Sequence, residues 1–185
     1  TIAKDVKIQV EFNPQKVAAF RLIGYENRIL AAEDFNDDKK DAGEIGAGHT
    51  VTALYEIIPV GVESDALGDV DKLKYQKKTK PSNTANNGEL LTIKLRYKQP
   101  DGDTSTLLKF PVKDTGKRFG EADQDFRFAA AVAQFGMLLR DSQFKGDSTY
   151  AALREIATEA AANDDSGYRQ EFLELVRIAH ELSGQ

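Results

Sequence analysis

The sequence of 185 residues contains no cysteine and no tryptophan, and it has only one methionine and two histidines. Without cysteine the chain has no disulfide, no thiolate zinc site, no cysteine-ligated iron–sulfur cluster and no cysteine nucleophile. No apolar run approaches the roughly 20 residues of a membrane-spanning helix, which predicts no transmembrane segment. His49 and His180 are the only imidazole bases. These absences exclude many redox and catalytic classes.

Charge is unevenly spread along the chain. Residues 1–119 carry 19 basic and 18 acidic side chains, whereas residues 120–185 carry 6 basic and 12 acidic ones. An acidic surface is poorly suited to a phosphate backbone, so we expect no nucleic-acid partner.

Alternation of apolar and polar residues, typical of half-buried strands, dominates the first part of the chain. It predicts five strands, at residues 6–12, 17–25, 50–60, 91–97 and 108–112. The second of these has apolar residues on both faces, and we expect it to be central in its sheet. A short edge strand at residues 73–76 is a sixth candidate. Because no helical pattern intervenes, the strands predict an antiparallel, β-sandwich-like arrangement.

Near Gly120 the period of the apolar residues changes from 2 to 3.6. Three helical stripes follow: Phe128, Val132, Phe135 and Leu139; Tyr150, Leu153, Ile156, Ala157 and Ala160; Phe172, Leu175, Ala179 and Leu182. The predicted fold class is therefore α+β. A β-rich, sandwich-like domain covers residues 1–119, and a three-helix C-terminal segment, packed on it or beside it, covers residues 120–185.

An acidic segment between the second and third predicted strands contains the strongest candidate for a metal site. Asp34, Asn36 and Asp38 occupy positions 1, 3 and 5 of an EF-hand-like loop, where oxygen ligands would face calcium. Lys39 stands where that loop needs glycine, and Ile45 stands where it needs a bidentate glutamate. A weak calcium site is one interpretation. The other is a solvated loop whose Asp and Asn side chains form turns and caps.

Strings typical of a catalytic centre are absent from the sequence. The spacing of Gly43, Gly46 and Gly48 matches neither the dinucleotide fingerprint nor the P-loop. No G-x-S-x-G string accompanies a serine. We therefore expect a non-enzymatic protein without a cofactor. Calcium-dependent binding of a carbohydrate or other ligand is the first alternative, and hydrolysis is a weaker one.

Three stretches carry a resemblance: VKIQVEFNPQKVAAFRLIGYENR (6–28), EDFNDDKKDAGEIGAGHTVTALYEIIP (33–59) and YRQEFLELVRIAHEL (168–182). Together they resemble the C-terminal region, a domain of unknown function, of bacterial von Willebrand factor type A domain-containing proteins. The resemblance implies an exported protein, often a lipoprotein of the cell envelope, at a periplasmic or outer-surface location. It implies no catalytic activity.

The metal-binding motif of the type A domain itself, Asp-x-Ser-x-Ser, is missing from this chain. The nearest string, residues 101–105, has Asp103 in place of the first serine, so no metal ligand carries over from the family.

These observations predict a protein–protein interaction or scaffolding module within a larger exported polypeptide. The expected partners are a neighbouring type A domain of the same polypeptide and a further protein. Strands that follow an inserted domain can pair with strands that precede it. We therefore expect residues 6–12 to lie at an exposed sheet edge.

Overall fold

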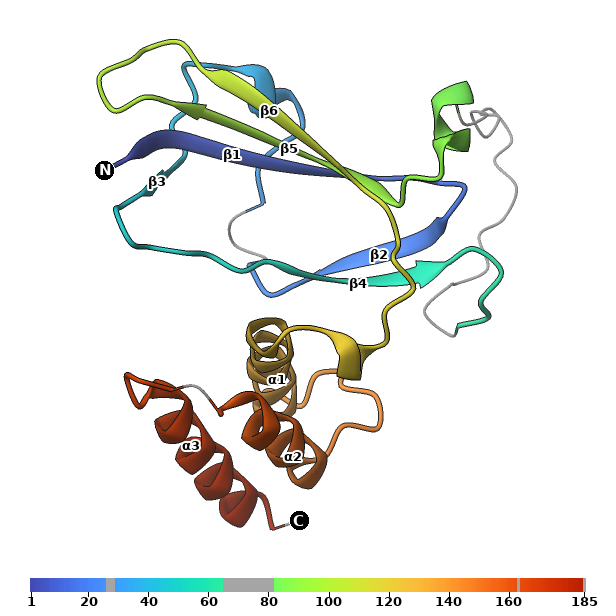
Figure 1. The fold of residues 1–185 in the computed structure, drawn as a ribbon, viewed down its shortest axis with the longest axis vertical. Helices are drawn as coiled ribbons and strands as arrows, with labels where there is room; N and C mark the ends of the chain where they lie inside the picture. The colour runs from blue at the N-terminus through green and yellow to red at the C-terminus, as the bar shows by residue number, and fades with distance from the viewer. Residues whose placement is uncertain (26–28, 65–81, 163, 185) are drawn as a thin grey trace. The chain divides into compact units, whose positions relative to one another are not determined.

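The computed structural model describes residues 1–25, 29–64, 82–162 and 164–184. The chain divides into two compact units, residues 1–115 and 116–185. In the described parts, the first unit holds six strands and the second holds three α-helices (Figure 1). The predicted α+β class is confirmed.

A four-stranded antiparallel sheet forms the larger layer of the first unit. Its order is β3-β1-β5-β6, and the strands span Gly43–Ile45, Ala3–Phe12, Leu91–Lys98 and Thr106–Val112. In the register of the sheet, Phe12 lies opposite Leu91, and Leu91 lies opposite Val112. Because side chains alternate between the faces of a strand, one face of this sheet is almost entirely apolar and the other is mainly polar.

The smaller layer is a two-stranded antiparallel sheet of β2 (Val17–Ile23) and β4 (Leu54–Pro59). It lies beside the larger sheet as a separate layer (Figure 1). Aromatic contacts join the two layers: the Phe20 ring stacks on Phe12 with centroids 4.2 Å apart, and Tyr55 meets Phe12 edge-on at 5.4 Å.

The prediction that the second strand is central in its sheet is wrong for the residues that the structure describes. In the described ranges β2 pairs only with β4. The cause is the corner between β1 and β2. There the Asn13 carbonyl accepts hydrogen bonds from the amides of Lys16 and Val17, each at 2.9 Å. This corner turns the chain out of the sheet of β1, so the two successive strands enter different layers.

The expected exposed edge along β1 is present only in part. Ala3 and Val6 pair with β3 on one side of β1, while β5 pairs along the other side. From Lys7 onward β5 is the only strand paired with β1 among the described residues. The three-residue strand β3 was not predicted, and the strand predicted at residues 50–60 is shorter at both ends. The candidate strand at 73–76 lies outside the described residues.

Three helices form the second unit: α1 (Gln124–Leu139), α2 (Tyr150–Ala160) and α3 (Tyr168–Ser183). The Asp123 carboxylate accepts a hydrogen bond from the Phe126 amide at 2.8 Å and caps α1. The Thr149 hydroxyl accepts from the Ala152 amide at 3.2 Å and caps α2. Leu153 and Val176 are fully buried between the helices. No helix within the described ranges combines the length and the hydropathy that crossing a bilayer requires.

Candidate functional site

The three residues of the predicted calcium loop point to three different partners. The Asp34 carboxylate lies 3.1 Å from the Lys40 ammonium. The Asn36 side-chain oxygen accepts from the Arg96 guanidinium at 3.1 Å, and the Asp38 carboxylate accepts from the Ser105 hydroxyl at 2.5 Å. Among the described residues, no group of three or more His, Cys, Asp or Glu side chains is arranged to hold a metal ion. The Arg96 guanidinium also donates to the Ser105 hydroxyl at 2.8 Å, so Asn36 and Asp38 meet at one Arg96–Ser105 pair, whereas Asp34 is bound separately by Lys40.

Two buried lysines of the sheet bind the backbone of this acidic loop. Lys7 of β1 is 3% exposed, and its ammonium donates to the Asp34 carbonyl at 3.1 Å and to the Asp37 carbonyl. Lys98 of β5 is 8% exposed, and its ammonium donates to the Asp38 carbonyl at 2.6 Å. Backbone carbonyls that would suit a bound cation therefore already face cations of the protein itself.

The contacts around Lys98 favour the charged forms of the groups that make them. Lys98 donates to the Asp5 carboxylate at 2.7 Å, and this bond lowers the pKa of Asp5 and raises the pKa of Lys98. The hydrogen bond from Ser105 lowers the pKa of Asp38. All three groups are therefore held in their charged forms at neutral pH. A general acid or base instead works best with a pKa near the working pH.

The contacts of the two histidines are with a backbone carbonyl and with an aromatic ring. His49 precedes β4, and its Nδ1 lies 3.2 Å from the Ala47 carbonyl oxygen. His180 lies in α3, where its ring stacks on Tyr150 with centroids 5.8 Å apart. Both contacts are local packing within one unit.

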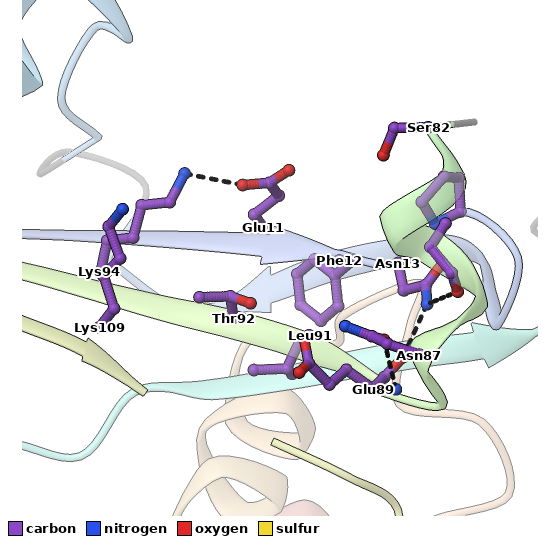
Figure 2. A pocket seen from close by; sticks show the side chains of 12 residues that line it. Glu11, Phe12, Asn13, Ser82, Asn87, Glu89, Leu91, Thr92, Lys94 and Lys109 are labelled. Atoms are coloured by element: carbon purple, nitrogen blue, oxygen red, sulfur yellow. Dashed lines mark hydrogen bonds and ion pairs between the residues drawn. The ribbon is translucent and has the colours of Figure 1, made fainter. Parts of the chain in front are cut away.

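A pocket of about 480 Å³ opens where β1 ends and β5 begins (Figure 2). Lys94 and Glu11 both line it, and the Lys94 ammonium forms an ion pair with the Glu11 carboxylate at 2.7 Å. Asn13 donates its side-chain amide to the carbonyls of Ala85, at 2.8 Å, and Glu89, at 2.7 Å. These polar groups bond to one another, which is typical of a structural corner. The sequence predicted turns at this point and gave no signal for a pocket.

The inner face of the larger sheet is only partly covered by the smaller one. The apolar side chains of β1, β5 and β6 that share the face of Phe12 are Ile8, Val10, Leu91, Ile93, Leu95, Leu108, Phe110 and Val112. Phe12 is covered by β2 and β4, but Ile8 is 56% exposed, Phe110 is 49% exposed and Leu108 is 38% exposed. Phe20 of β2 is 57% exposed although it stacks on Phe12. We call Ile8, Phe20, Leu108 and Phe110 the open inner face.

Several strands beside the open inner face have an edge to which no other described strand is paired. In the part of the chain that the structure describes, β6 pairs only with β5, and β2 and β4 pair only with each other. A two-stranded sheet is marginally stable on its own, and an edge strand presents a row of main-chain donors and acceptors to a partner. Apolar surface and available strand edges therefore occur together in the first unit.

Comparison with known proteins identifies a family for the chain. The family described as "Uncharacterized protein YfbK, C-terminal" matches residues 1–182. The chain is 40% identical over 179 residues to the "Uncharacterized protein YfbK" of Escherichia coli (strain K12). That alignment covers 97% of this chain and 30% of the relative, so the chain spans less than a third of the length of the curated relative it matches. No solved structure matches the chain.

Proposed function

The chain belongs to the YfbK C-terminal family, and from this premise we propose that it is a non-catalytic interaction and scaffolding module of a longer polypeptide. The observation that carries the proposal is the open inner face. Burial of apolar surface stabilises a complex by about 25 cal/mol per Å². A partner that covers side chains such as Phe110 and Ile8 is therefore bound more tightly. A patch of this kind is typical of an interaction site.

The partner that we propose is a neighbouring domain of the same polypeptide. The relative has more than two thirds of its length outside the match, which leaves room for further domains. The resemblance carried by residues 6–28, 33–59 and 168–182 supports a von Willebrand factor type A domain in that role. It also supports an exported protein of the cell envelope.

A non-catalytic role is supported by how the titratable groups of the first unit are used. Lys7, Lys98 and Asp38 each bind other parts of the same unit. The acidic loop acts as a cover on the polar face of the sheet. The opposite, apolar face is left for contact with a partner.

The proposal is tested by comparing the thermal unfolding of this chain alone with its unfolding inside the longer polypeptide. A domain that docks on the open inner face stabilises the first unit, and a gain of about 1 kcal/mol would raise its melting temperature by about 4–8 °C. An unchanged melting temperature would contradict the proposal.

A matched pair of variants locates the contact. Phe110→Ser removes a ring of the open inner face, whereas Leu107→Ser alters the opposite face of the same strand, where Leu107 is 36% exposed. We expect Phe110→Ser to reduce the stabilisation by the longer polypeptide and Leu107→Ser to leave it unchanged. Equal effects of the two variants would place the contact elsewhere.

A further inference from the structure

We propose that an extended segment from another part of the polypeptide pairs with an edge of the β2–β4 sheet and completes that layer over the open inner face. This inference rests on the proposed function, since it places the segment in the same polypeptide. It adds the mode of contact, which is strand addition.

The two layers of the first unit are unequal in width. Neighbouring strands lie about 4.8 Å apart, so a four-stranded layer is about twice as wide as a two-stranded one. In a β-sandwich, the side chains of both inner faces interdigitate to form the core. Here the larger sheet has Leu108 and Phe110 on its edge strand β6, and the smaller layer leaves both partly exposed. A further strand beside β2 or β4 would widen the smaller layer and cover them.

An added strand would provide both main-chain hydrogen bonds and apolar cover, whereas a helix would provide only apolar cover. Main-chain N–H and C=O groups require partners once they are removed from water. In the described residues, no strand pairs with the outer edge of β2 or with that of β4. A helix laid over Phe20 and Phe110 would bury apolar side chains but leave these edges without hydrogen bonds. An added strand supplies both hydrogen bonds and apolar cover.

The edges of β2 and β4 have little protection against pairing: the irregularity between Val17 and Ala19 and the terminal Pro59 lie together at one end of the layer. Exposed edge strands are commonly guarded by lysines, inward-pointing charges or bulges. β2 (VAAFRLI) has one charged residue, Arg21, and β4 (LYEIIP) has one, Glu56. Arg21 and Glu56 form an ion pair with each other across the two strands. Each of these charges therefore has a partner in the neighbouring strand of the same layer. Such edges favour a permanent partner strand.

The length of the relative favours a segment of the same polypeptide over a second copy of the chain. The match covers only 30% of that protein, which leaves ample sequence to supply one strand. A tethered segment has an effective concentration in the millimolar range, so pairing within the polypeptide competes well against association of two copies.

Hydrogen exchange tests strand addition directly. We would measure amide exchange in residues 17–23 and 54–59 of the 185-residue chain and of the longer polypeptide that contains it. We expect exchange in at least one of these strands to be tenfold or more slower in the longer polypeptide. Residues 91–98 are the internal control, because β5 already pairs on both sides and its exchange should change little.

The outcomes separate the two proposals. Slower exchange along β2 or β4 supports strand addition. If residues 17–23 and 54–59 are unchanged while other parts of 1–115 become protected, strand addition is wrong but docking stands. No change anywhere in residues 1–115 overturns both. Slow exchange of both strands in the 185-residue chain alone, or protection that rises with its concentration, overturns strand addition from the same polypeptide.

Discussion

The two units of this chain reach a folded state by different means. The helical unit buries seven apolar residues among those described, and Leu153 and Val176 are fully enclosed. The first unit is larger, yet its buried side chains in the described ranges are Val17, Phe35 and the two lysines of β1 and β5. The helices therefore have a fully enclosed core of their own, while the sheets are held by main-chain pairing, lysine–carbonyl bonds and the partly exposed aromatic contacts around Phe12. This difference predicts separate responses to mutation.

The largest effect is expected from the centre of the helical core. Leu153→Ala removes a fully buried side chain and should lower the free energy of unfolding of the helical unit by about 3–5 kcal/mol. Urea unfolding followed by circular dichroism at 222 nm measures this loss. Leu182→Ala is the control, because Leu182 is 83% exposed and its loss should cost little. If strands and helices unfolded together in Leu153→Ala, the two units would form one cooperative structure.

A smaller loss of unfolding free energy is expected in the first unit, where the buried side chain is a lysine. Lys7→Met removes the donor to the Asp34 and Asp37 carbonyls, and leaving buried acceptors without a partner costs about 1–3 kcal/mol. Lys94→Met is the control, because its ion pair with the exposed Glu11 is worth about 0–1 kcal/mol. Nuclear magnetic resonance of strand amides during urea unfolding distinguishes the two. Equal losses would show that the buried lysine does not hold the loop.

The helices were predictable because a helix is a local structure. The period of 3.6 residues located all three, and the stripe from Tyr150 to Ala160 is the buried face of α2. The other two stripes were right only in part. Val132 is 43% exposed, and α1 instead buries Ala131, because the packing face is set by neighbouring helices.

Strand pairing was less predictable, because partners are distant in the sequence. Alternation located β1 and β5, but nothing in either segment indicates that Phe12 pairs with Leu91. The short β3 lacks alternation altogether, since it contains only Gly43, Glu44 and Ile45. The burial of Lys7 was also missed, because a lysine in an alternating strand indicates a solvated face. Its acceptors are backbone carbonyls, and their positions appear only in the folded loop.

Acid should lower the stability of the first unit modestly and more than that of the helical unit. Folding lowers the pKa of Asp5 through Lys98 and the pKa of Asp38 through Ser105. A carboxyl with a lowered pKa binds fewer protons when folded than when unfolded. Its contribution to stability is therefore present above the unfolded pKa, about 3.9, and is lost as the pH falls through the folded value. We therefore expect the melting temperature of the first unit to decrease when the pH is lowered below about 4.

The helical unit provides the comparison for this pH dependence. Arg177 lowers the pKa of Glu174, but that pair is solvent-exposed and screened, so its contribution is smaller. Asp5→Asn should reduce the acid dependence of the first unit, and asparagine tolerates the positive φ of 50° at this position. Asp103→Asn, at a fully exposed side chain, is the control. An unaltered acid dependence in Asp5→Asn would show that the Asp5–Lys98 pair does not link folding to pH.

The smallest effect is expected from calcium. Calcium takes six to eight oxygen ligands, and the loop around Asp38 would have to supply them from carbonyls that already bind Lys7 and Lys98. Displacing two buried ammonium groups is costly, so millimolar calcium should leave the melting temperature unchanged. Asp38→Ala should lower that temperature equally with and without calcium, since it removes the acceptor of Ser105. A calcium-dependent rise that Asp38→Ala abolishes would instead make the polar face of this sheet a ligand site, and the first unit would then have functional groups on both of its faces.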